Sequence, residues 1–215
     1  MKGTGELDYK RLLAESLDSQ EYKEYIENKH TSFGVKLVEI YSSTDLNKAF
    51  PNNGGILGEL LTKAMSNGDK INDVKSRLAG ELSSINFTSY MDYPANGFFQ
   101  DKGNDTRQDN PVYVRSISYG KAAFFVVESK YSYKEVADAI LSKLSLSNVE
   151  NTEEILKNST ITLFTVMDFQ QIAEIYRSFA DLDAFLSTPF TELSYGYPIF
   201  CQGAYTKDNT PFRED

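Results

Sequence analysis

One long run of β-branched and aromatic residues dominates the pattern of apolar and polar positions along this chain. It spans residues 111–129, PVYVRSISYGKAAFFVVES, and predicts a strand roughly three times the common length. Beyond Gly120 both faces of this strand become apolar, with Phe125 and Val127 on one face and Phe124 and Val126 on the other. A glycine within a strand often marks a bend or a close approach. The pattern therefore predicts one long, bent, central strand.

Other segments carry the periodicity of helices or strands around this one. Apolar residues at helical spacing predict helices over residues 6–28, 44–68 (interrupted at 51–55), 69–80, 132–144 and 169–186, with a helical turn at 153–158. Strands are predicted over residues 31–42, 83–93, 159–167 and 197–205, and a loop over 94–110. Because no repeat or linker interrupts the chain, we expect residues 1–215 to form a single α+β domain with a mainly antiparallel sheet.

The charge and composition exclude several classes of partner. A net charge of -9 disfavours nucleic acids and simple adsorption to anionic lipid, since both require a basic surface. No run of eighteen apolar residues and no N-terminal signal segment is present. The single cysteine, Cys201, cannot form an internal disulfide and is predicted to be a buried small hydrophobe.

Candidate catalytic and metal-binding chemistry is sparse, so we expect no enzyme activity, no metal and no cofactor. The lone His30 offers almost no general base, and Gly54, Gly55 and Gly58 do not form a phosphate-binding fingerprint. Four residues of the predicted loop do not have the spacing of a calcium-binding loop: Asp101, Asn104, Asp105 and Asp109.

Several stretches resemble, in their order along the chain, segments of the cholesterol-dependent (thiol-activated) cytolysins. PVYVRSISYGK resembles the family strand P-x-Y/F-V-x-x-V-A-Y-G-R, and EEILKNSTITLFTV resembles x-I-L-x-N-S-S-F-T-A-V-V-L. The segments YSSTDLNKAF, SSINFTSYMDYP and YSYKEVADAILSKL resemble those beside the two membrane hairpins of the family, and Tyr197-Pro198-Ile199 stands where the family has Pro-Ile-Ser-Tyr. The resemblance covers roughly residues 31–210.

This resemblance implies a bent, twisted, mainly antiparallel four-stranded sheet flanked by two helical clusters, the core of the membrane-attack and cytolysin proteins. It implies a secreted or released subunit that is soluble before it assembles with copies of itself on a target membrane and converts the clusters, about residues 44–68 and 132–156, into β-hairpins. The side chains that would enter the membrane are Leu46, Phe50, Ile56, Leu57, Leu60, Leu61, Val136, Ile140 and Leu144. The sheet bend and the oligomer edge would involve Tyr119, Gly120, Ile161, Met167 and Asp168.

The sequence also departs from the family pattern. Pro51 and Asp138 fit poorly into inserted strands, and Met167-Asp168 replaces a glycine pair thought to free an edge-covering segment. Val35, Leu37 and Ile161 replace side chains used there in subunit contact. The Trp-rich, cholesterol-recognising end has no counterpart, so we expect a second protein component or another membrane-binding element to supply membrane binding. Three hypotheses follow: a pore-forming subunit, a non-lytic scaffold or binding protein with permanent helices, and an enzyme, which lacks a catalytic constellation.

Overall fold

The computed structural model describes residues 33–66, 73–91, 111–144, 150–167, 175–191 and 193–212. Its strands form one antiparallel sheet of six strands in the order β1–β2–β3–β4–β5, with β6 pairing with β3 outside this path. The strands are β1 (Gly34–Glu39), β2 (Ser76–Tyr90), β3 (Val112–Ser129), β4 (Ser159–Val166), β5 (Ile175–Tyr176) and β6 (Tyr197–Tyr205). The predicted antiparallel α+β fold is confirmed. The predicted number of four strands was too low, because β5 and β6 also join the sheet.

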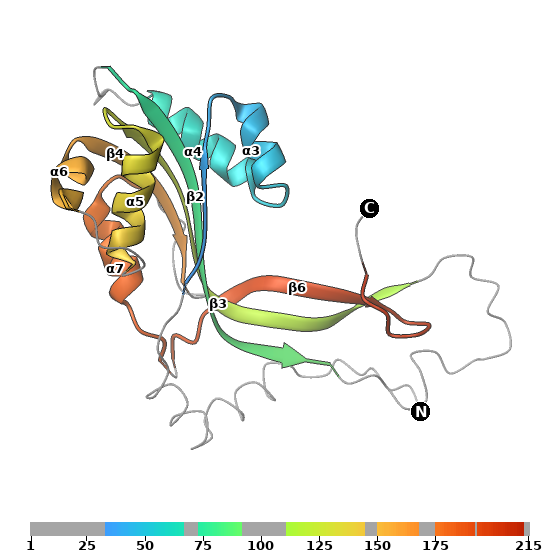
Figure 1. Cartoon of the computed structure of the whole chain (residues 1–215). Coiled ribbons are helices and arrows are strands. Elements are labelled where there is room, and N and C mark those ends of the chain that lie inside the picture. Colours follow the sequence, from blue (N-terminus) through green and yellow to red (C-terminus); the bar gives the residue numbers. More distant parts are fainter. Residues whose placement is uncertain are drawn as a thin grey trace, which may run out of the picture.

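The central strand is β3, as predicted, and it changes its partner halfway along its length. One edge pairs with β2 from Ser116 to Ser129, whereas the other edge pairs with β6 up to Gly120 and with β4 from Ala122 onward. Figure 1 shows that β3 bends strongly where this exchange takes place. Lys121 is the residue between the two partners.

Helices cover both faces of the half of the sheet that follows the bend (Figure 1). On one face, α3 (Ser43–Ala49) and α4 (Gly54–Ser66) pack against Ala122, Phe124 and Val126. On the other face, α5 (Tyr133–Lys143), α6 (Thr152–Lys157) and α7 (Phe179–Ser187) pack against Ala123, Phe125 and Val127. The two-sided apolar run of β3 is therefore the centre of two separate cores, which we name the α4 core and the α5 core.

Two predicted helices were wrong in part. Residues 76–80, predicted to be helical, begin β2, in which Leu78, Gly80 and Leu82 follow strand periodicity and Gly80 lies beneath the ring of Phe125. Within the predicted helix 169–186, Ile175 and Tyr176 pair with β4, and α7 begins only after Ser178. Short apolar runs fit either period, so contacts with neighbouring strands decided these cases.

The other half of β3 belongs to a three-stranded arm that has no helices of its own in the described residues. The arm consists of residues 85–90 of β2, residues 112–120 of β3, and β6, and it projects away from the helices (Figure 1). Val112, Val114 and Phe200 are exposed on it. Cys201 is also exposed, so the prediction of a buried cysteine was wrong. Cys201 pairs with Ile117 in the arm, outside both helix-covered cores of the described residues.

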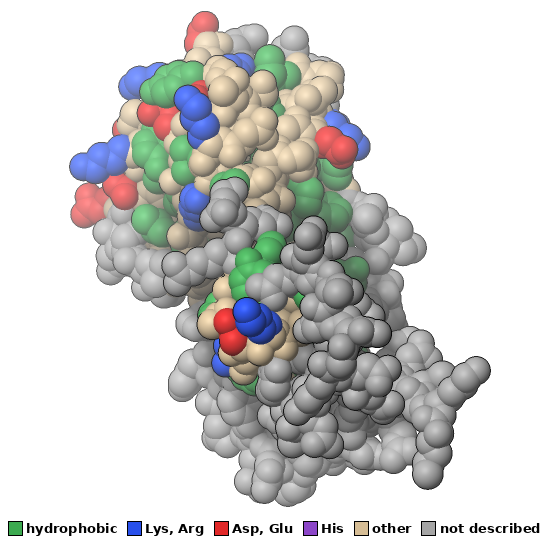
Figure 2. All heavy atoms as spheres, turned by 90° about the vertical axis from the view of Figure 1, so that its right-hand side faces the viewer, with side chains coloured by type: hydrophobic (Ala, Val, Ile, Leu, Met, Phe, Trp, Pro, Cys, Tyr) green, Lys and Arg blue, Asp and Glu red, His purple; other side chains and the backbone are tan. Residues whose placement is uncertain are grey.

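The predicted helix 6–28, the predicted loop 94–110 with its acidic residues, and His30 lie outside the described residues. Over the described part that Figure 2 displays, side chains of both charge signs are interspersed among apolar ones.

Candidate functional site

Both helical clusters leave the sheet at the same end. The end of β1 lies opposite the start of β2, with Glu39 paired to Leu78, and Ser129 at the end of β3 pairs with Ser76 and Ser159 at the starts of β2 and β4. The first cluster, α3 and α4, joins β1 to β2, and the second, α5 and α6, joins β3 to β4. Each cluster therefore connects two antiparallel neighbours at the position where a hairpin turn would otherwise stand.

The apolar residues predicted for the first cluster lie almost entirely in the α4 core. Ile56, in contrast, is 37% exposed. The buried members are Leu46, Phe50, Leu57, Leu60 and Leu61. In this structure these side chains thus stabilise the packing of the cluster on the sheet.

Local hydrogen bonds fix where α3 begins and how it meets the sheet. The backbone N–H groups of Tyr41 and Ser42 donate to Asp45, at 3.1 and 2.8 Å, and these bonds lower the pKa of the Asp45 carboxyl. The Lys36 amino group donates to the carbonyl of Ala49, and the Asn53 amide donates to Glu81 at 3.2 Å. Polar contacts to β1 and β2 therefore hold both ends of the turn around Pro51.

The second cluster is fixed in a similar way. Ser132 and Glu135 form a capping box, and the hydrogen bonds from Ser132 lower the pKa of Glu135. Val136 and Ile140 are fully buried in the α5 core, and Leu144 is partly buried at its margin. The Tyr133 hydroxyl donates to the carbonyl of Leu37 in β1 at 3.1 Å. The predicted helix and apolar face of this cluster are thus confirmed.

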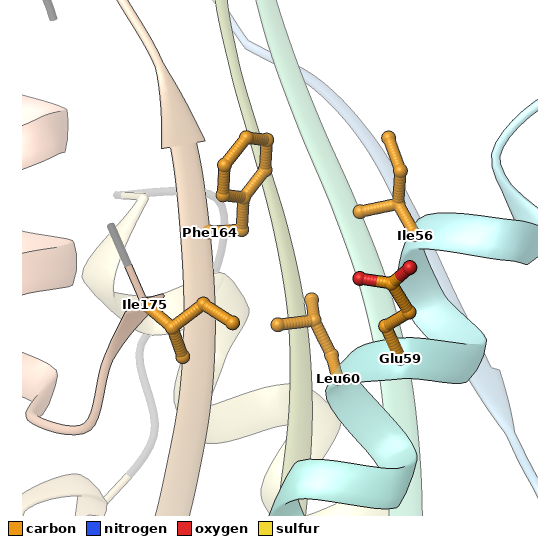
Figure 3. Close-up of a pocket in the computed structure, with 5 residues that line it drawn as sticks. All are labelled: Ile56, Glu59, Leu60, Phe164 and Ile175. Carbon is orange, nitrogen blue, oxygen red and sulfur yellow. The ribbon is translucent and has the colours of Figure 1, made fainter. Parts of the chain in front are cut away.

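A cavity of about 260 Å³ separates the first cluster from the edge of the sheet. Figure 3 shows Ile56, Glu59 and Leu60 of α4 facing Phe164 of β4 and Ile175 of β5 across this space. Side chains that line an unfilled space lack dispersion contacts on one side. Phe164 and Ile175 still pack against the α4 core, so the pocket opens at the margin of this core beside β4 and β5.

The bend of β3 is a point of close backbone approach. A Cβ atom at Gly120 would lie 2.1 Å from the carbonyl oxygen of Ser84. Opposite it, β2 contains a bulge between Ile85 and Phe87. On the other side, Gly196, with φ of 109°, lies directly against the backbone of Gly120. A side chain at Gly120 would therefore collide with β2, and one at Gly196 would collide with the backbone of Gly120, which agrees with the close approach predicted at Gly120.

Aromatic rings pack beside the bend. The ring of Tyr119 stacks on Phe87 with 5.0 Å between centroids and meets Tyr195 edge-on at 6.0 Å. Burial, and then the nearby Tyr195, raise the pKa of the Tyr119 hydroxyl. This cluster ties β2, β3 and the segment before β6 together at the position where the sheet bends.

The two edges of the helix-covered sheet are β1 and β5. Val35 and Leu37 on β1 are partly buried. At the other edge, β5 covers β4 through only two residue pairs, Leu163 with Tyr176 and Phe164 with Ile175. Ile161 is buried in the α5 core, Met167 packs partly buried against it, and Asp168 lies outside the described residues.

Sequence reasoning missed Lys121 as a functional candidate. The available signal was a lysine that directly precedes the apolar run AAFFVV, and its side chain is buried.

Among the described residues, no group of three or more His, Cys, Asp or Glu side chains is arranged to hold a metal ion. None of the described helices is both long enough and apolar enough to cross a bilayer.

Comparison with solved structures identifies the fold. Listeriolysin O matches 94% of this chain with a TM-score of 0.71 and 18% identity over 44% of its own length. The human-specific toxin intermedilysin matches the same share with a TM-score of 0.67 and 20% identity over 46% of its length. The chain has the fold of the cholesterol-dependent cytolysins. The resemblance seen in the sequence is thus confirmed at the level of the fold.

A non-hemolytic pneumolysin from Streptococcus pneumoniae strain ST306 shares this cytolysin fold, with a TM-score of 0.63 and 18% identity over 94% of this chain and 45% of its own length. The chain spans less than half the length of the cytolysins it matches. No family model matches the chain. A comparison with curated proteins found no match in sequence.

Proposed function

We propose that this protein is a pore-forming-toxin-like subunit that assembles with copies of itself on a target membrane. Its two helical clusters, about residues 44–68 and 132–156, then convert into β-hairpins. The observation that carries this proposal is the topology of the sheet. Both clusters leave the sheet at the same end, and each cluster joins two antiparallel neighbouring strands. If both clusters became extended, β1, β2, β3 and β4 would all lengthen beyond the same end of the sheet.

The lengths of the clusters support this conversion. A strand needs ~9–11 residues to cross a bilayer, so a hairpin with its turn needs ~20–25. Both clusters meet this requirement. The exchange would move the buried side chains of the clusters from the two cores to lipid, which keeps them away from water in both states.

The same side chains show where the conversion meets resistance. In an extended second cluster, Val136, Ile140 and Leu144 would share one face with Asp138, whose charge opposes contact with lipid. In the first cluster Pro51 would stand within a strand. We therefore expect the second cluster to insert more readily than the first.

Membrane recognition is assigned to an element other than these residues, because the matched part of the cytolysins is less than half of each. We infer that a second protein component, or a further part of the same protein, brings the subunit to its target. The subunit itself would be secreted or released and would remain soluble until that encounter. No catalytic chemistry is needed for this role.

The alternative function is a non-lytic scaffold or binding protein on the same fold. Polar contacts hold both clusters on the sheet, including Asn53 with Glu81 and Tyr133 with Leu37. Met167 also stands where the resembled family has the first glycine of its pair. The fold is compatible with this role, since a pneumolysin described as non-hemolytic also adopts it.

Release of a trapped dye from phosphatidylcholine vesicles, with and without cholesterol, tests the proposal when a His-tagged subunit is attached to them through a nickel-chelating lipid, which supplies the membrane attachment assigned above to another element. A Cys201→Ser background removes the exposed native thiol. Cysteines at Asn53 and Glu81, whose side chains touch at 3.2 Å, can be joined by a short cleavable thiol reagent to lock the first cluster. The matched control joins cysteines at Arg77 and Glu128, a cross-strand pair 2.7 Å apart that leaves both clusters free.

We expect the unlocked protein to release the dye and the 53–81 link to abolish this release. Cleavage of that link should restore release, and the 77–128 link should leave it unchanged. Release that continues through the 53–81 link contradicts conversion of the first cluster. Intact vesicles of every composition, with a monomer throughout, would favour the scaffold.

A further inference from the structure

Lys121 is a buried cation whose hydrogen bonds all go to the end of one helix. Its side chain is 2% exposed. The amino group donates to the carbonyls of Phe185 at 2.7 Å, Thr188 at 2.6 Å and Leu186 at 3.4 Å. A lysine ammonium has three donors, so all of them face carbonyls at the C-terminus of α7. These carbonyls have no partners within their own helix and carry its partial negative charge.

Aromatic rings replace water around this group. The amino nitrogen lies 5.2 Å from the ring centroid of Phe33, 5.1 Å from that of Phe185 and 5.6 Å from that of Phe190. No carboxylate of the described residues forms an ion pair with it. Burial lowers the pKa of Lys121 to about 8. The carbonyls and ring faces are therefore the groups that compensate its removal from water.

The helix that Lys121 contacts follows the weakest strand of the sheet. β5 pairs with β4 at only two positions, and a strand this short has little stability of its own. Only Arg177 and Ser178 separate it from α7. α7 is held by the buried Leu182 and Phe185, by an exposed ion pair between Asp183 and Lys143 at 2.8 Å, and by Lys121. The edge of β4 is thus covered by a segment whose anchor is α7.

Lys121 also lies at the bend. It follows Gly120 and stands between the last residue of β3 paired to β6 and the first paired to β4. A change in the bend at Gly120 would change the direction of the Lys121 side chain relative to α7. The bend of β3 and the position of β5 and α7 are therefore linked through Gly120 and Lys121.

We propose that Lys121 is a positioning residue that holds α7, and through α7 the edge strand β5, against β4. Straightening of β3 at Gly120 withdraws the amino group from the three carbonyls and loosens α7. Only the straightening rests on the proposed function. The positioning itself is a property of the monomer.

Hydrogen exchange of the monomer without membranes tests the positioning role. Lys121→Met removes the donors with little change in length, and Lys121→Arg restores them. The matched control, Lys143→Met, removes the exposed ion pair to the same helix. We expect Lys121→Met to raise exchange in residues 159–167 and 175–187 by about tenfold or more, the effect of losing charge-assisted hydrogen bonds in one local unit.

Residues 34–39 at the opposite edge, and residues 76–82 of β2 beside it, should keep their wild-type exchange. Lys121→Arg should stay near wild type, and Lys143→Met should change exchange less than about threefold. An equal increase at both edges, or no increase at residues 159–167, overturns the inference. If Lys121→Met yields no folded protein, Lys121→Gln takes its place, because its amide donates without a charge. The same comparison of exchange at the two edges then supports or overturns the inference. Failure of vesicle release would leave this result unaffected.

Discussion

The two halves of β3 differ in what covers them. From Gly120 to Ser129 every residue is buried, whereas residues 112–119 are exposed or partly buried except for Ser116. The first group has apolar side chains on both faces and lies between the two helical clusters. The second group has polar residues on both faces and belongs to the bare arm. One strand thus consists of a part that is buried on both faces and a part that is exposed or partly buried, and the two parts meet at Gly120.

This difference shows what the proposed conversion would require. A strand that is apolar on both faces needs cover on both faces. Departure of the clusters would expose Phe124 and Val126 on one side and Phe125 and Val127 on the other. The helix-covered half is therefore stable only when the clusters or their replacement are present, whereas the arm can stay unchanged in both states.

The largest expected difference between the halves comes from truncating one side chain in each. Phe125 is fully buried in the α5 core, so Phe125→Ala should lower the free energy of unfolding by about 3–5 kcal/mol. Val114 is 47% exposed on the arm, and Val114→Ala should cost about 0.5 kcal/mol or less. Urea denaturation followed by circular dichroism measures both. Similar losses for the two variants would contradict the division of β3.

A smaller effect is expected at the junction itself. Gly120→Ala places a Cβ against the Ser84 carbonyl and the Ile85 Cα, both of which belong to the backbone and cannot move aside cheaply. We expect a loss of about 2–3 kcal/mol in the free energy of unfolding. Thermal denaturation at matched protein concentration gives the comparison.

Gly58→Ala is the matched control for this substitution. A Cβ at Gly58 meets nothing within 4 Å, so alanine should stabilise α4 by about 0.5–1 kcal/mol. Because it stabilises the helical form, it should also slow vesicle release. A neutral Gly120→Ala, or a destabilising Gly58→Ala, would show that close approach at the bend is not what selects glycine.

The smallest expected effect is a dependence on pH that belongs to Lys121. The pKa of this group falls from 10.5 to about 8 on folding, so between these values the unfolded chain binds more protons than the folded one. Stability should therefore rise with pH across this window, by on the order of 1 kcal/mol between pH 7.5 and 9.5 after partial solvent screening. The groups that face Lys121 are carbonyls and phenyl rings, none of which titrates there.

The free energies of unfolding of the wild type and Lys121→Met, measured in urea at the two pH values, isolate this contribution. The pKa of Tyr119 is raised above 10, so that group titrates beyond the window. The rise should be present in the wild type and absent in the variant. The same rise in both proteins would assign it to another group.

Much of the fold could be predicted because its signals are local. The run AAFFVV indicated a strand buried on both faces, the apolar spacing of residues 132–144 indicated a helix, and Gly120 indicated the bend. Order along the chain was also sufficient for the resemblance to the cytolysins, although each motif alone was weak. These features depend on side-chain periodicity and backbone freedom, which are properties of neighbouring residues.

Only the tertiary structure decided the features that depend on distant partners. Residues 76–80 and 175–176 have sequences that fit more than one period, and pairing with β3 and β4 made them strands. Cys201 sits in an apolar segment, yet the arm leaves it exposed. Lys121 is followed by apolar neighbours, and only the fold brings the end of α7, more than sixty residues along the chain, to its amino group. Such contacts arise from the packing of whole elements, so no local pattern encodes them.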